Sequence, residues 1–119
     1  MHHKYTEINL DKSLLVRFKT IYKNSLVLHF KFYNKDSESI DVSQAQFKFV
    51  VTDAQKTQEF IVVNNADWIR DSTNEIKHII TSLNIVPDDY KVDFTITYSD
   101  GRIQTLMDGE FIVRDRYIL

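Results

Sequence analysis

Residues 90–98 alternate strictly between apolar and polar side chains, and this pattern constrains the fold more than any other part of the chain. Successive side chains of a strand point to opposite faces, so one face of this segment carries aromatic and branched residues while the other carries lysine, aspartate and threonine. Asp100 and Gly101 follow, and they can adopt the positive φ angles of a tight turn. Residues 102–107 are then expected to return antiparallel. The sequence therefore predicts a half-buried hairpin near the end of a β-sheet domain.

Other segments with the same period of two indicate that the whole chain is rich in strands. They are residues 13–18, 25–33, 45–52, 57–63, 74–81 and 110–113. Asp108 and Gly109 are expected to form a bulge or bend, and residues 64–71 hold at most a single helical turn. We expect an all-β, immunoglobulin-like antiparallel β-sandwich of about seven strands.

The composition limits the classes of partner that the chain can have. Its 119 residues suffice for one core, and its net charge of −2 comes from interspersed residues that leave no footprint for nucleic acid. The sequence has no apolar run long enough to cross a membrane and no signal peptide. The absence of cysteine excludes disulfides and thiolate metal sites. We expect a single domain with no nucleic-acid or membrane partner.

Titratable residues that could carry chemistry show no motif. His2 and His3 are adjacent and would need further ligands to hold a metal, while His29 and His78 lie at outward or edge positions of predicted strands. The aspartates fall in turns or on wet strand faces and do not match a calcium loop. We therefore predict no catalytic residue, no metal site, no cofactor and no enzymatic activity.

Aromatic side chains leave one binding function open. Most of them share the parity of the leucine, isoleucine and valine residues of their strands, which favours core packing. Tyr33, Trp68 and Tyr117 are exceptions that a carbohydrate-binding platform could use. Tyr90 has a structural interpretation instead, because a tyrosine that starts a strand after residues 87–89 can donate its hydroxyl to the connector before it, as in the tyrosine corner of Greek-key sandwiches.

Three segments of the chain resemble a known family. They are residues 23–30, 40–49 and 87–113, and they are similar to the immunoglobulin-like N-terminal domain family found in baseplate upper proteins of tailed bacteriophages. The resemblance implies a virion structural module that is assembled in the host bacterial cytoplasm. Such domains usually head longer proteins with receptor-facing parts, whereas this sequence ends at Leu119. We therefore expect an accessory role on the capsid, neck, tail or baseplate, in multiple copies, with the capsid surface slightly preferred.

The two ends of the chain are the predicted partner-binding regions. Residues 1–12 are expected to form an N-terminal arm and residues 114–119 a C-terminal tail, both attached to a single domain over residues 1–119. An arm can add a strand to the sheet edge of a neighbour. The residues predicted to bind partners are Tyr5, Ile8, Leu10, Tyr117, Ile118 and Leu119. The alternatives are a carbohydrate- or cell-surface-binding β-sandwich module and, less favoured, a small hydrolase.

Overall fold

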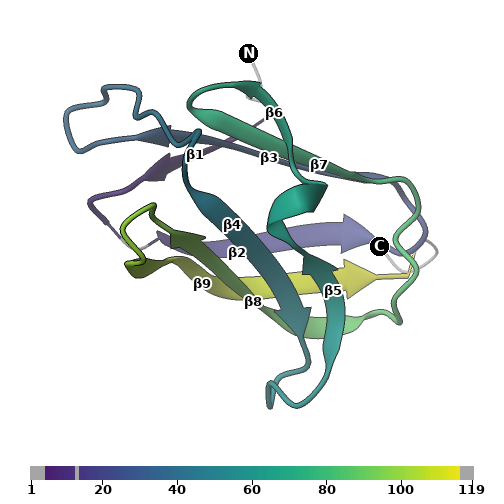
Figure 1. The fold of residues 1–119 in the computed structure, drawn as a ribbon. Helices are drawn as coiled ribbons and strands as arrows, with labels where there is room; N and C mark the ends of the chain where they lie inside the picture. The colour runs from purple at the N-terminus through teal and green to yellow at the C-terminus, as the bar shows by residue number, and fades with distance from the viewer. Residues whose placement is uncertain (1–4, 13, 116–119) are drawn as a thin grey trace.

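A computed structural model describes residues 5–12 and 14–115, and these residues form nine strands and one short 3₁₀ helix (Figure 1). The predicted all-β sandwich is confirmed, with nine strands in place of about seven because Thr6–Asn9 and Ile69–Ser72 form strands that the pattern did not indicate. The elements are β1 (Thr6–Asn9), β2 (Leu14–Ile21), β3 (Leu26–Tyr33), β4 (Gln46–Thr52), β5 (Glu59–Val63), η1 (Asn65–Asp67), β6 (Ile69–Ser72), β7 (Glu75–Ile80), β8 (Asp88–Thr97) and β9 (Ile103–Arg114).

The strands form two sheets that pack face to face (Figure 1). One sheet has the order β1-β3-β7-β6 and the other has the order β2-β9-β8-β4-β5. If β2 and β5 are left out and the other seven strands are lettered A to G in chain order, the first sheet reads ABED and the second contains GFC. β5 then lies beside C and β2 beside G. This is the strand arrangement of immunoglobulin-like sandwiches. In the described part of the chain, no helix is long and apolar enough to cross a membrane.

The sheets are mixed and not wholly antiparallel as predicted, because each receives one parallel strand from the start of the chain. β1 pairs parallel with β3, and β2 pairs parallel with β9. The reversal between β1 and β2 is a tight turn in which the Lys12 N–H donates to the Asn9 carbonyl oxygen at 3.1 Å and the Asp11 N–H donates to Asn9 Oδ1 at 2.9 Å. This turn moves the chain from one sheet to the other.

The alternation of residues 90–98 is borne out by the burial of β8. Val92, Phe94 and Ile96 are fully buried between the sheets, while the intervening side chains lie on the outer face. Aromatic rings fill much of the core, and the Phe30 and Phe94 ring centroids lie 4.6 Å apart. Aromatic residues buried in this way contribute large apolar areas to the stability of a small domain.

The connector before β8 contains the predicted tyrosine corner. The Tyr90 hydroxyl donates a hydrogen bond to the carbonyl oxygen of Val86, four residues upstream. Burial and the nearby charge of Asp88 raise the pKa of the Tyr90 phenol. The Phe60 ring packs edge-on against Tyr90 with 5.0 Å between centroids, so the corner is held from both sides.

The bulge of the last hairpin lies earlier in β9 than predicted. The register between β8 and β9 shifts at Phe94, where Leu106 is the extra residue, and the strand runs unbroken through Asp108 and Gly109. Both Leu106 and Met107 are fully buried. Gly109 has a different function, because a Cβ atom there would lie 2.1 Å from the Val16 carbonyl oxygen. Only glycine lets β2 approach β9 at this point.

Candidate functional site

The N-terminal residues predicted to bind partners belong instead to the sandwich. Ile8 is fully buried in the core, since it lies on β1 and faces the opposite sheet. Leu10 is partly buried against the core, and its N–H donates to the Tyr33 carbonyl oxygen at 2.8 Å. The described part of the predicted arm is therefore an edge strand and its turn. The prediction was wrong for Ile8. Its short segment pairs with β3, and this pairing places the Ile8 side chain in the core.

Leu10 is also tied to the last hairpin of the other sheet. Its carbonyl oxygen accepts a hydrogen bond from Gln104 Nε2 at 2.8 Å, and Gln104 Oε1 accepts one from the Tyr98 hydroxyl at 2.6 Å. This chain of side-chain hydrogen bonds anchors the turn between β1 and β2. The remaining predicted partner-binding residues, Tyr117, Ile118 and Leu119, lie outside the described residues.

Tyr5 lies over a polar cluster on the outer face of the four-stranded sheet. Its ring centroid is 5.7 Å from that of His29, and Lys31 Nζ lies 4.2 Å from its centroid. His29 Nε2 is 2.7 Å from Glu75 Oε2, and Ser72 Oγ donates to the other carboxylate oxygen at 2.9 Å. The hydrogen bond from His29 and the one from Ser72 hold the pKa of Glu75 below its ordinary value. The cluster joins β3, β6 and β7 with Tyr5, the residue before β1.

His78 does not face outward as the sequence suggested. It lies on the core side of β7, where its ring packs against Trp68 at 6.0 Å between centroids and its Nδ1 is 3.0 Å from the Asp67 carbonyl oxygen. Trp68 is itself 7% exposed and donates from Nε1 to the Phe47 carbonyl oxygen at 3.3 Å. These two side chains close one end of the core, so Trp68 offers no ring face to a sugar.

Aspartates in the loops stabilise turns, as predicted. Asp100 Oδ1 accepts the Arg102 N–H at 3.0 Å, and hydrogen bonds from Arg102 lower the pKa of this carboxyl. Asp41 accepts the Ser43 N–H at 2.8 Å, and its pKa is lowered by the hydrogen bonds from Ser43. The described residues contain no group of three or more histidine, aspartate or glutamate side chains placed to hold a metal ion.

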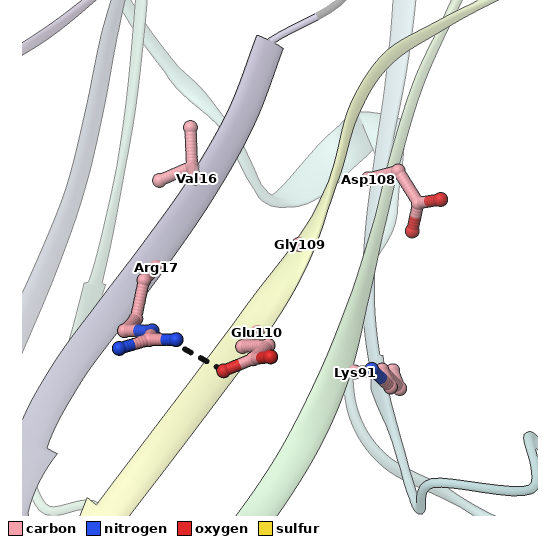
Figure 2. A pocket seen from close by; sticks show the side chains of 6 residues that line it. All are labelled: Val16, Arg17, Lys91, Asp108, Gly109 and Glu110. Carbon is pink, nitrogen blue, oxygen red and sulfur yellow. Dashed lines mark ion pairs between the residues drawn. The ribbon is translucent and has the colours of Figure 1, made fainter.

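A shallow depression of about 400 Å³ lies on the outer face of the five-stranded sheet (Figure 2). Arg17 on β2 and Glu110 on β9 point toward one another across it, with 3.2 Å between Nε and Oε2. Glu110 is opposite Lys91 in the register of β8 and β9. Basic, acidic and basic residues thus follow one another across three strands. The other lining residues are Val16, Asp108 and Gly109.

The β2 margin, defined as residues 12–23, is the part of this face best placed for a partner. β2 is one of the two edge strands of its sheet and pairs with β9 on one side only, as far as the described residues extend (Figure 1). The margin contains four basic residues and no acidic one, within a chain whose net charge is −2. The basic residues are Lys12, Arg17, Lys19 and Lys23.

The sequence contained a signal for this margin that the strand pattern alone did not reveal. Residues 12–35 contain no acidic residue, and the margin is the first half of this run in a chain whose charges are otherwise mixed. The pattern of Val16 and Phe18 predicted a strand, but alternation does not say whether that strand is central or at an edge. The charge run and the edge position together identify the surface.

Comparison with known proteins adds no assignment. The chain matches no protein-family model, and no curated protein is detectably similar to it in sequence.

Proposed function

We propose that this chain is a non-enzymatic structural module of a bacteriophage virion, an immunoglobulin-like domain that decorates or bridges a larger assembly. The observation that carries the proposal is the open β2 margin on an immunoglobulin-like frame. The frame agrees with the fold that the resemblance to baseplate modules implies. The margin gives it a surface by which it could join other subunits.

The physical basis of the proposal is the contrast between a closed core and an open edge. The two sheets bury an aromatic core, and within the described residues every buried side-chain nitrogen and oxygen has a hydrogen-bond partner. A domain of this kind is rigid enough to act as a building block. β2, by contrast, presents main-chain groups on its unpaired side, which is the usual basis for strand addition. The capsid surface remains slightly preferred over the tail or baseplate.

Binding to particles tests the proposal directly. An antibody against the chain is used to probe virus particles purified by density gradient from the source whose genome encodes it, before and after high-salt washing. The chain is expected to co-purify with particles, and immunogold labelling then distinguishes the capsid from the tail. Recovery of the chain only in the soluble fraction, with none on particles, would contradict the proposal.

Glycan binding is the alternative function, and it makes a different prediction. A sugar-binding module usually stacks an exposed aromatic ring on the sugar, but the Trp68 ring is buried at one end of the core. Tyr33 is half-buried, on β3. A glycan array screened with the labelled chain would favour this alternative only if Tyr33→Ala abolished the signal.

A further inference from the structure

We infer that the open edge of β2 binds an extended, acidic segment of a partner protein by strand addition. The inference rests on the proposed function, because it names the surface and the kind of partner by which the module would join its assembly. In this binding mode the main chain of the edge supplies hydrogen bonds and the alternate side chains supply specificity. Three features of the β2 margin support it.

The first feature is the length and regularity of β2 among the described edge strands. β1 and β6 have four residues each, and β5 has five with a register shift against β4. β2 has eight residues, and its register with β9 runs without a shift from end to end. Short strands, bulges and charged side chains, especially lysine, protect sheet edges against added strands. β2 is neither short nor bulged, and its protection is the positive charge of Arg17 and Lys19, which repels a basic strand but not an acidic one.

The direction of the main-chain N–H and carbonyl groups shows which residues of β2 can hydrogen-bond to an added strand. The Tyr22 N–H donates to the Arg114 carbonyl oxygen at 2.8 Å, and the Val16 carbonyl oxygen also faces β9. Because main-chain groups alternate in direction along an edge strand, those of the odd-numbered residues face away from β9. The N–H and carbonyl groups of Arg17 and Lys19 therefore point to the open side.

The second feature is a groove beside the edge, with an apolar wall on the core side. β1 pairs with β3 only from Thr6 opposite Phe30 onward, so among the described residues the side of the sandwich between β2 and the start of β3 is open. A groove of about 260 Å³ lies there. Half-buried Phe18 on β2, Leu28 and Phe30 form its core-side wall, and the remaining lining residues are Tyr5, Thr6, Val27 and His29. An added strand would direct alternate side chains into this groove. Those side chains should be apolar.

The third feature is the charge of the outer side chains. Arg17 and Lys19 are exposed and share the outer face of β2. Arg17 also forms an ion pair with Glu110, and the flanking Lys12 and Lys23 add two more positive charges. The outward side chains of an added strand would lie beside Arg17 and Lys19. Opposite charges across paired strands are favourable and like charges are unfavourable. The partner strand should therefore alternate apolar residues with aspartate or glutamate.

The same charges disfavour pairing between two copies of this chain. If two β2 edges met, four basic residues from each copy would be brought together with no acidic residue in either margin. An acidic partner avoids this repulsion. Self-association through β2 is therefore an outcome that would contradict the inference.

Titration of the ¹⁵N-labelled full chain with short peptides tests the inference. The probe is a capped peptide in which valine alternates with glutamate, and its control is the same peptide with lysine in place of glutamate. The glutamate peptide should shift the amide signals of Arg17 and Lys19 most strongly. The lysine peptide should bind at least about tenfold more weakly, because it places like charges beside the edge.

Two variants at Lys19 separate the main-chain from the charge contribution. Lys19→Pro removes an N–H on the open side without removing a donor to β9, and proline is tolerated in edge strands. It should weaken binding of the glutamate peptide by about tenfold or more. Lys19→Glu keeps the N–H but reverses the charge, and it should shift the preference toward the lysine peptide. Hydrogen exchange at Phe18 and Thr20 reports whether β2 still pairs with β9 in each variant.

Several results would overturn the inference. These are equal binding of the two peptides, no binding of the glutamate peptide, signal shifts centred on β5 or on a sheet face, and undiminished binding by a folded Lys19→Pro variant. A dimer in sedimentation experiments that Lys19→Pro dissociates would assign the edge to a second copy instead. The proposed function fails separately, because it requires the chain on particles whatever the peptides do.

Discussion

The Tyr90 hydroxyl donates a hydrogen bond to the carbonyl oxygen of Val86 and thereby fixes the connector that leads into β8. Tyr90→Phe keeps the ring and its contact with Phe60 but removes the donor. We expect the free energy of unfolding in urea to fall by about 1 kcal/mol, the usual contribution of one such hydrogen bond. Tyr33→Phe is the matched control, because the Tyr33 hydroxyl makes no hydrogen bond within the described residues. Equal stability of the two variants would show that the corner contributes nothing.

Gly109 should be the less replaceable of the two glycines. Gly109→Ala places a Cβ atom 2.1 Å from the Val16 carbonyl oxygen, so β2 must move away from β9. We expect a loss of about 2 to 3 kcal/mol, as for other overpacked sites. Gly101→Ala is the control, because Gly101 has a φ of +91° but no atom within 4 Å of the added Cβ, and backbone strain alone costs about 1 kcal/mol.

Hydrogen exchange distinguishes the two glycine variants further. Gly109→Ala should expose the amides of Phe18 and Thr20, which face β9, while Gly101→Ala should leave them protected. Full protection of these amides in Gly109→Ala would show that the sheet accommodates the methyl group without moving β2.

Sequence reasoning predicted the parts of the fold that depend on local alternation. It identified β8, the Asp100 and Gly101 turn and the Tyr90 corner, because each is determined by side chains close together in the chain. It predicted an arm over residues 1–12 where β1 in fact pairs with β3, since alternation marks a strand but does not name its partner. The bulge was misplaced for a related reason: Leu106 and Met107 are both apolar, and only the paired strand shows that one of them is extra.

The candidate site was less predictable than the fold because it depends on strand order. The sequence placed the binding residues in an N-terminal arm, yet Ile8 became part of the core. Whether a strand lies at the edge depends on the assembled sheet, and no residue of β2 indicates its edge position. The excess of basic residues near Lys19 was visible in the sequence, but it gained meaning only when the strand was found at a margin.

Two aspartates on the outer face should destabilise the sheet. Asp93 and Asp108 lie directly opposite one another in β8 and β9, and both are exposed. Like charges at such positions repel, so Asp93→Asn and Asp108→Asn should each raise the free energy of unfolding by about 0.2 to 1 kcal/mol at low salt. The double variant should gain less than the two single gains added together, because either substitution alone removes the repulsion.

Asp89, which lies on β8 like Asp93, provides the control for this pair. Asp89 forms an ion pair with Arg114 at 2.8 Å, so Asp89→Asn should be neutral or slightly destabilising. Stabilisation by all three substitutions would indicate a general effect of net charge instead of the specific pair. The gain at Asp93 and Asp108 should also shrink as salt is added.

Glu75 should give the domain a measurable dependence on acidic pH. Its pKa is lowered in the folded state, first by the hydrogen bond from His29 and then by that from Ser72. A carboxyl group with a lowered folded-state pKa stabilises the fold above its ordinary pKa of 4.5, and that stabilisation is lost as pH falls through the folded-state value.

At pH 7 we expect Glu75→Gln to lower the free energy of unfolding by about 1 kcal/mol. The difference between wild type and variant should shrink as the pH is lowered below about 4.5. Urea unfolding across this pH range measures the difference in free energy of unfolding. Glu59→Gln is the control, because the Glu59 side chain forms no hydrogen bond or ion pair within the described residues. A constant difference between wild type and Glu75→Gln at every pH would show that the carboxylate charge does not contribute, and that the variant acts through packing alone.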